Sequence, residues 1–428
     1  MARFLYTLLW YLILPLVPLR LWWRGRREPG YRVRIGERFG RYRSEAPVPR
    51  GDVIWIHAVS LGETRAVAPL VERITRASPS ATILLTHMTA TGREAGRALY
   101  GDGVQQVWLP YDVPFAIAAF LARFRPRVGL LMETEVWPNL VAACHRDGVP
   151  LYLVNARLSD KSASGYARFP SLTRPMFASL AGAAAQTSGD AARLTIAGAH
   201  DVVVTGNLKF DVVLPAESES LGRELRVRFG ESRPAWIAAS TRDGEEALIL
   251  DALKRHALPP QTLTVIVPRH PQRFSAVAEL LRARGIPFVR RSENRPVPAD
   301  VAIVLGDSLG ELPGYYAAAD VAFVGGSLLP LGGQNLIEPI ALGMPTLVGP
   351  HTFNFSEATD NAVAAGAALR IGDADALMTE VGELLDDPAR RKRMRDAALA
   401  FHAAHRGATD RLWAWLAPRI PVSRSSGD

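Results

Sequence analysis

A carboxylic acid follows the first apolar segment after the N-terminal region, at a place suited to proton transfer. Residues 53–59 are largely apolar, and Ser60, Gly62 and Glu63 come next. A carboxyl group partly removed from water at a strand end can act as a general base, because desolvation raises its pKa toward neutrality. Ser60 and Glu63 also have the spacing of a capping box, in which the acid only closes the first turn of a helix. The residues alone leave both interpretations open.

Two further acids follow a second apolar segment. Glu133 and Glu135 come directly after residues 128–132, and Asn155 and Arg157 follow the next apolar segment. Two acids at a strand end can exchange protons with a substrate, hold sugar hydroxyls or place negative charge at a helix N-terminus. We expect these polar residues to lie on one rim of the first domain, facing an acceptor substrate.

The second half of the chain carries a glycine-rich stretch that could bind an anion. An apolar segment ends in Gly326 and Ser327, and Gly333, Asn335 and Glu338 follow. Glycines let the backbone approach a ligand closely, and the N–H groups of a helix N-terminus attract phosphate. Asn335 and Glu338 also have capping-box spacing, so the stretch is equally consistent with a plain helix start.

Polar and basic residues end two earlier segments of this half. Ser240 follows residues 235–239, and Arg269 and His270 follow residues 263–267. Arginine suits a phosphate because its guanidinium is planar and always charged. His270 is as consistent with a neutral hydrogen-bond donor as with an ordinary loop residue.

Short apolar segments alternate with helix-like segments from residue 53 onward, which predicts an α/β fold. The apolar segments lack strict alternation, as is typical of strands buried on both faces of a parallel sheet. A polar stretch at 206–220 marks a domain boundary. We expect two doubly wound Rossmann-like domains facing a cleft, with ligands beyond the carboxyl ends of the strands. The predicted strands are residues 53–59, 82–88, 104–109, 128–132, 151–154, 182–187 and 202–205, then 235–239, 263–267, 286–289, 301–305, 321–324 and 345–348.

The N-terminal segment predicts contact with a membrane. Residues 4–23 contain one charge, Arg20, and are just long enough to cross a bilayer. Residues 20–50 hold ten arginines against three acids, a net of +7 within a formal chain charge of +8. The basic excess therefore flanks the apolar segment, and the positive-inside rule places the following domains in the cytoplasm. Pro15 and Pro18 leave open whether the segment spans the bilayer or lies at its surface.

Several chemistries lose support from what the chain lacks. The sequence has no Gly-x-Gly-x-x-Gly after a strand, no P-loop and no Gly-x-Ser-x-Gly elbow. The single cysteine, Cys144, excludes an internal disulfide and a Cys-rich metal cluster. Asp373 and Asp375 lie where a helix should begin, so we interpret them as capping rather than metal-binding residues. We expect neither a cofactor nor a metal.

A set of strand-end motifs resembles the 3-deoxy-D-manno-octulosonic acid (Kdo) transferase family over essentially the whole chain. Together the motifs are highly specific, although none is so alone. Gln334 stands where many members of that family have histidine, which argues against a role for an imidazole there. The motifs are residues 57–63, 133–138, 155–159, 206–211, 268–274, 323–327 and 349–355.

The resemblance implies a GT-B glycosyltransferase of lipopolysaccharide biosynthesis. Such an enzyme moves Kdo from CMP-Kdo to the lipid A precursor (lipid IVA), with inversion, at the cytoplasmic face of the inner membrane. The expected partners are CMP-Kdo, the lipid A precursor and inner-membrane lipids, without nucleic acid. The resemblance also implies that Glu63 is the catalytic base. The expected donor-binding residues are Arg269, His270, Gly326, Ser327, Gly333, Asn335, Glu338, Ser240 and Lys209, and the acceptor-side candidates are Ser60, Gly62, Glu133, Glu135, Asn155 and Arg157.

The expected division of the chain follows from these assignments. A membrane anchor with its basic flank covers 1–30, an acceptor-binding domain 31–211, a CMP-sugar-binding domain 212–422 and a disordered tail 423–428. Two alternatives stay open. One is another GT-B enzyme, a transferase or epimerase that uses a UDP-sugar. The other is a non-catalytic, membrane-tethered lipid-binding protein in which Glu63 and Glu338 are only caps.

Overall fold

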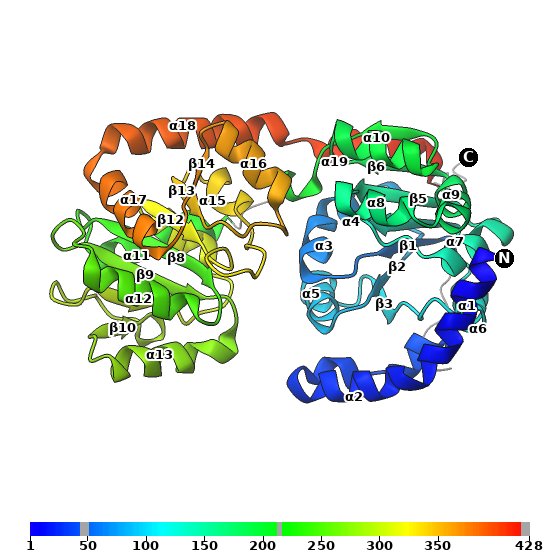
Figure 1. Ribbon diagram of the computed structural model, residues 1–428, viewed down its shortest axis with the longest axis horizontal. Helices are drawn as coiled ribbons and strands as arrows, with labels where there is room; N and C mark the ends of the chain where they lie inside the picture. Colours follow the sequence, from blue (N-terminus) through cyan, green and yellow to red (C-terminus); the bar gives the residue numbers. More distant parts are fainter. Residues whose placement is uncertain (43–50, 212–215, 421–428) are drawn as a thin grey trace. The chain divides into compact units, whose positions relative to one another are not determined.

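The chain forms two compact units, shown in Figure 1. The computed structural model describes residues 1–42, 51–211 and 216–420, so the predicted disordered tail lies outside the described residues. One unit comprises Met1–Val212 together with Arg406–Asp428, and the other comprises Val213–His405. Each unit is built on a seven-stranded sheet.

The sheet of the first unit has the strand order β3-β2-β1-β4-β5-β6-β7, and neighbouring strands run parallel. Its central strands are buried on both faces, which explains why their sequences do not alternate in polarity. The strands are β1 Val53–His57, β2 Thr82–His87, β3 Gln105–Trp108, β4 Val128–Met132, β5 Leu151–Ala156, β6 Gly182–Ala185 and β7 Val202–Val204. The helices after β1 are α3 Leu61–Ala66, α4 Ala68–Ala77, α5 Ala90–Tyr100, α6 Pro114–Phe124, α7 Pro138–Arg146, α8 Asp160–Ala167, α9 Pro170–Ala178, α10 Ser188–Ala197 and the 3₁₀ turn η4 Leu208–Asp211.

The second sheet has the order β10-β11-β9-β8-β12-β13-β14, again with parallel neighbours. Its edge strand β14, Ala368–Arg370, was not predicted, because it has three residues and is partly exposed. The remaining strands are β8 Ala235–Thr241, β9 Leu263–Pro268, β10 Phe288–Arg290, β11 Ile303–Leu305, β12 Val321–Val324 and β13 Thr346–Val348. The helices are α11 Glu217–Phe229, α12 Glu245–Arg255, η5 Pro271–Arg273, α13 Phe274–Ala283, η6 Arg291–Glu293, α14 Leu312–Ala318, α15 Ile337–Ala341, α16 Ser356–Ala364, α17 Ala374–Asp386 and α18 Pro388–His405.

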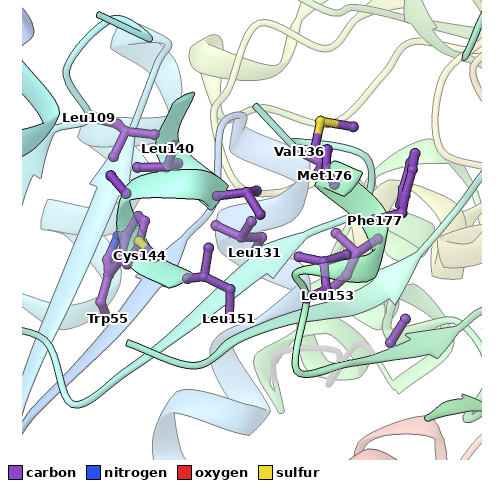
Figure 2. Close-up of a cluster of buried hydrophobic side chains, with 14 of the residues drawn as sticks. Trp55, Leu109, Leu131, Val136, Leu140, Cys144, Leu151, Leu153, Met176 and Phe177 are labelled. Carbon is purple, nitrogen blue, oxygen red and sulfur yellow. The ribbon is translucent and has the colours of Figure 1, made fainter. Parts of the chain in front are cut away.

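Apolar side chains cover both faces of the first sheet. Figure 2 shows one of these clusters, in which Trp55 of β1 lies among leucines of the neighbouring strands and helix α7. The Trp55 indole N–H donates to Thr86 Oγ1 at 2.8 Å, so this large side chain is buried without an unsatisfied polar atom. Cys144 is a free cysteine buried in the same cluster. Packing of this kind holds the strand ends in fixed positions, and the site depends on them.

The strand order of each sheet reverses at one place. In the first sheet β1 lies between β2 and β4, and in the second sheet β8 lies between β9 and β12. In an open parallel sheet the loops on either side of such a reversal leave toward opposite faces, and a ligand-binding crevice is expected between them at the carboxyl ends of the strands. Both reversal points coincide with motifs that the sequence singled out, which are Glu63 and Glu133 in the first unit and Gly326 in the second.

The end of the chain returns to the first unit, which corrects the expected domain 212–422. Helix α19, Ala408–Leu416, and the turn η7, Ala417–Arg419, bury Leu412 and Leu416 in the apolar cluster of the first unit (Figure 1). The carboxylate of Asp211 accepts hydrogen bonds from the backbone N–H groups of Gly407, at 2.7 Å, and Thr409, at 2.5 Å. Asp211 therefore caps a helix almost two hundred residues further along the chain, a pairing that local sequence patterns do not show.

The apolar N-terminal segment forms two helices, α1 Ala2–Ile13 and α2 Val17–Arg27, joined by the 3₁₀ turn η1 Leu14–Leu16. Residues 2–26 include a window that is long and apolar enough to cross a membrane, with 11% of that window buried in the structure. Helix α1 packs on its own unit. Thr7 Oγ1 donates to Asn139 Oδ1 at 3.0 Å, and the rings of Trp10 and Tyr111 lie 5.8 Å apart.

Alternating cations and aromatic rings hold the basic flank of α2 against the first sheet. Arg24 lies over Tyr31, Arg38 lies 3.8 Å from the ring centroid of Trp108, and Arg93 lies 4.8 Å from the same centroid. Tyr31 belongs to η2, Pro29–Arg32, and Arg38 to η3, Ile35–Phe39. Cation–π contacts of this kind are strongest away from water, and Arg38 and Trp108 are both fully buried. Arg24 and Arg38 of the basic segment thus have a structural role.

Candidate active site

Glu63 lies at the start of α3, beyond the carboxyl end of β1. Ser60 is the N-cap residue of this helix, and the Glu63 N–H donates to Ser60 Oγ at 3.3 Å. In return Glu63 Oε2 accepts the Val59 N–H at 2.8 Å, and Glu63 Oε1 accepts the Ser60 hydroxyl at 2.7 Å. The Ser60 cap is therefore confirmed, but the predicted capping box forms only in part, because Glu63 accepts the N–H of Val59 and not that of Ser60. Each oxygen still has a lone pair to spare, so capping does not exclude proton transfer.

The surroundings of Glu63 favour a role in proton transfer. The pKa of Glu63 is raised to about 7, mainly by burial and also by the charges of Glu133 and Glu135, while the hydrogen bonds from Ser60 and Val59 oppose the rise. A carboxyl group that titrates near neutrality is suited to act as a general base at physiological pH. Glu63 is 7% exposed, so its buried charge needs a functional explanation.

Glu133 and Lys209 form an ion pair beside Glu63. Lys209 Nζ lies 2.7 Å from Glu133 Oε1, and both side chains are about one-fifth exposed, at 19% and 20%. Lys209 was expected to bind the donor, but η4 places it in the first unit with the acceptor-side candidates. Nearby, the Trp137 indole N–H donates to Glu135 Oε2 at 3.1 Å, and burial raises the pKa of Glu135.

Asn155 has a structural role, which corrects its expected place on the acceptor side. Its side chain is fully buried, and Asn155 Oδ1 accepts the Leu208 N–H at 2.9 Å. Since Leu208 begins the turn that carries Lys209, Asn155 positions Lys209 rather than contacting a substrate. Arg157 is partly exposed, and Gly62 is exposed beside Glu63, so these two residues remain on the accessible rim.

Three of the predicted site residues have a left-handed backbone. The φ angles are 57° at Glu133, 51° at Asn155 and 55° at Ser240. Each residue lies at or just past the carboxyl end of a strand, and Ser240 lies at an irregularity in the pairing of β8 with β9. Such conformations cost free energy in residues with a Cβ and are concentrated at functional sites. The strain supports the choice of these strand ends, even though Asn155 and Ser240 are themselves buried.

The N–H groups of Gly326 and Ser327 in the second unit already have a partner within the protein, which corrects a central expectation. Glu245, the first residue of α12, accepts the N–H of Gly326 at 2.6 Å and that of Ser327 at 3.0 Å. A carboxylate of the protein thus occupies the position where the sequence predicted a phosphate. Glu245 was missed because its partners lie some eighty residues away. The sequence feature that could have pointed to Glu245 is the acid pair Glu245 and Glu246, which directly follows a glycine at the end of a strand loop.

The two glycines of this stretch adopt a backbone that favours glycine, but the helix that follows them does not start with the predicted cap. Gly326 and Gly333 have φ angles of 68° and 75°, a left-handed backbone that favours glycine at both positions. The expected capping box of Asn335 and Glu338 is wrong. Helix α15 begins at Ile337, the Asn335 side chain accepts the Ile337 N–H at 3.0 Å, and its amide donates to Glu338 Oε1 at 3.1 Å.

Arginines cluster at the carboxyl ends of β8 and β9. Arg269 Nε donates to Gln334 Oε1 at 3.1 Å, and Gln334 lies against Gly326. Partial burial and the charges of Arg269, Arg242 and Arg273 lower the pKa of His270, so this imidazole is neutral near pH 7. A neutral histidine beside Arg242 and Arg269 can donate a hydrogen bond to an anion that the two guanidinium groups bind.

No group of three or more His, Cys, Asp or Glu side chains is arranged to hold a metal ion in the part of the chain that the structure describes. Asp373 Oδ1 accepts the Ala376 N–H at 2.8 Å, so the interpretation of Asp373 as a helix cap is confirmed.

Two family models and several full-length relatives match this chain. A family model described as 3-deoxy-D-manno-octulosonic-acid transferase (kdotransferase) matches residues 33–212, and one described as glycosyl transferases group 1 matches residues 287–401. The 3-deoxy-D-manno-octulosonic acid transferase of Bordetella pertussis is 48% identical over 97% of this chain and 100% of its own length. The enzyme of the same name from Haemophilus influenzae is 38% identical over 98% of this chain and 99% of its own length.

A solved structure shows the likeness in fold. The UDP-GlcNAc 2-epimerase from Neisseria meningitidis superposes with a TM-score of 0.58 at 17% identity, covering 86% of this chain and 100% of its own. Two Rossmann-like units, together with these matches, define a glycosyltransferase of the GT-B class. The chain belongs to the 3-deoxy-D-manno-octulosonic acid transferase family.

Proposed function

We propose that this protein transfers Kdo from CMP-Kdo to the lipid A precursor, with Glu63 as the base. The observation that carries the proposal is the Glu63 carboxyl, buried beside Glu133 at the crevice of the first sheet, with its pKa raised to about 7. Membership of the family supports the choice of substrate class, and the position and pKa of Glu63 support its role as the base. The crevice of the second unit supplies basic groups suited to a nucleotide phosphate.

In the proposed reaction the Glu63 carboxylate takes the proton of an acceptor hydroxyl. The hydroxyl oxygen then bonds to the anomeric carbon of Kdo, while the bond from that carbon to the CMP phosphate oxygen breaks. CMP leaves with the electron pair, and the anomeric configuration inverts. The side chains of Arg242 and Arg269 stabilise the charge that develops on the phosphate. They replace the backbone N–H groups expected from the sequence, because Glu245 already accepts those groups.

Mass analysis of the lipid product tests the proposal. With CMP-Kdo and lipid IVA, the purified protein is expected to add the mass of at least one Kdo unit and to release CMP. UDP-N-acetylglucosamine offered in place of CMP-Kdo is expected to remain unchanged. Turnover of the UDP-sugar without turnover of CMP-Kdo would favour the alternative GT-B enzyme. No turnover of either donor would favour the lipid-binding alternative.

The N-terminal helices suggest how the protein meets the acceptor lipid. Leu12 of α1 and Leu19 of α2 are 68% and 65% exposed, and Trp22 and Trp23 of α2 are exposed as well. The opposite side of the same helices packs on the first unit, where Val17 and Leu21 are buried. A helix that packs on its domain along one side and exposes apolar residues along the other is suited to lie in the membrane surface rather than to cross the bilayer. The proposed location is the cytoplasmic face of the inner membrane.

Vesicle sedimentation checks this location. Replacing Leu12 and Leu19 together by glutamate is expected to weaken binding to vesicles with anionic lipid at least about 100-fold, because each buried leucine contributes roughly 1.5–3 kcal/mol. The control is Ile196→Glu on α10, which is 75% exposed and should bind like the wild type. An in-plane anchor is released from membranes by alkaline carbonate. A protein that resists this extraction would instead have a spanning helix.

A further inference from the structure

One buried carboxylate in the second unit accepts four backbone N–H groups. Glu245 Oε2 accepts the N–H of Arg242 at 2.8 Å and of Gly326 at 2.6 Å, and Glu245 Oε1 accepts those of Ser327 at 3.0 Å and Leu328 at 2.9 Å. The side chain is 0% exposed. Two oxygens with four acceptor positions are thereby fully used, so this carboxylate has no capacity left for a ligand.

The four donors belong to two loops that come from adjacent strands. Arg242 follows β8, and residues 326–328 follow β12, at the place where the order of the second sheet reverses. The loops approach each other too closely for any side chain at Gly325. A Cβ there would lie 2.8 Å from Thr241 Cα and 3.0 Å from Glu245 Oε2. Glu245 therefore fixes the spacing of the two loops that border the crevice.

The same carboxylate is connected to both arginines of the site. It binds the backbone of Arg242 directly. Residues 325 and 326 in turn accept the N–H groups of Gln334, at 3.1 Å, and Gly333, at 2.7 Å. The Gln334 side chain then accepts Arg269 Nε at 3.1 Å. A change in the turn at 326–328 would consequently move Gln334 and Arg269 as well as Arg242.

We propose that Glu245 is a positioning residue of the donor site, which sets Arg242 and Arg269 at the separation that a nucleotide phosphate requires. The inference rests on the proposed function, because it names CMP as the ligand of these arginines. Glu245 does not contact the donor. It acts by holding the two loops, and its negative charge in the turn directs the phosphate to the guanidinium groups instead of the backbone.

The variant Glu245→Gln tests this role with almost no change in side-chain size. The amide nitrogen would face two N–H donors that a carboxylate oxygen now accepts, and buried donors left without an acceptor are destabilising. The loops relax to avoid this contact. We expect CMP to bind about tenfold more weakly in calorimetry and the KM for CMP-Kdo to rise by a similar factor, with kcat within about threefold of the wild type.

Glu246→Gln is the matched control. Glu246 is equally buried in the same helix, but it accepts Thr241 Oγ1 at 2.9 Å and pairs with Arg273 at 3.0 Å, without a hydrogen bond to the turn at 326–328 in the described structure. We expect this variant to lose thermal stability and keep the wild-type KM and affinity for CMP. Where Glu245→Gln does not fold, Glu245→Asp keeps the charge on a shorter side chain and should show a smaller rise in KM.

The outcomes separate the two proposals. Wild-type affinity for CMP in Glu245→Gln, or a loss of kcat with unchanged KM, would mean that Glu245 only stabilises the fold, and would overturn this inference alone. An equal rise in KM in Glu246→Gln would also overturn it. A wild-type protein that binds a UDP-sugar and not CMP would overturn the proposed function, and this inference with it.

Discussion

Replacing Glu63 by glutamine is expected to remove nearly all Kdo transfer while leaving the fold intact. Loss of a general base typically lowers the rate about 10²- to 10⁴-fold. The fold should persist because glutamine can still close the first turn of α3. Its oxygen can accept the Val59 N–H, now 2.8 Å from Glu63 Oε2, and its amide can donate to Ser60 Oγ, now 2.7 Å from Glu63 Oε1. The substitution then removes only the ability of residue 63 to accept a proton.

The pH dependence of the contribution of Glu63 to folding stability makes this test sharper. The folded pKa of Glu63, about 7, lies above its ordinary value of 4.5. A group raised in this way stabilises the folded state most below pH 4.5, and the contribution is lost as the pH rises through 7. At pH 8 the wild type therefore carries the full cost of a buried charge that glutamine lacks. The variant should be at least as stable there as the wild type.

Steady-state rates and thermal unfolding at pH 8 check this result together. Glu72→Gln is the control, because Glu72 lies on α4, is exposed and pairs only with Arg76 among the described ion pairs. It should keep wild-type activity. Near-normal transfer by Glu63→Gln would show that another group is the base. Loss of activity together with a large drop in unfolding temperature would show that Glu63 acts chiefly as a cap.

The sequence predicted the two-sheet architecture because strands buried on both faces, such as β1 and β4, are continuous apolar runs. The same patterns placed Glu63 and Glu133 just after buried parallel strands, where ligands bind in such sheets. Edge strand β14 was missed because it is short and only half buried. The return of α19 to the first unit was missed because its cap, Asp211, is distant in sequence.

The errors within the site have one physical cause. A capping or anion-binding pattern shows which backbone groups need a partner, and tertiary structure decides which partner they have. For the N–H groups of Gly326 and Ser327 the partner is Glu245, and for that of Leu208 it is Asn155. The side chain of Glu133 likewise has a distant partner, Lys209. In each case the two residues are more than fifty positions apart or belong to separate strand loops. Local spacing cannot predict such pairs, although it located the loops correctly.

The pH dependence of the reaction should follow the ionisation of Glu63. Only the carboxylate can accept a proton, so kcat/KM is expected to fall about tenfold per pH unit below a midpoint near 7, where Glu63 titrates. Burial is the main cause of this high pKa, and the charge of Glu133 is the next. Removing that charge should therefore shift the midpoint to lower pH without restoring the ordinary value.

Glu133→Gln makes this shift measurable. The substitution removes a negative charge beside Glu63 and also leaves Lys209 without its carboxylate partner 2.7 Å away. Both effects favour the ionised form of Glu63, so they lower its pKa in the same direction. The midpoint of the kcat/KM profile is the quantity to compare, because it does not depend on any loss in absolute rate. A midpoint that stays at 7 or moves upward would show that Glu133 does not act on the base electrostatically. A flat profile in the wild type would remove Glu63 from the mechanism.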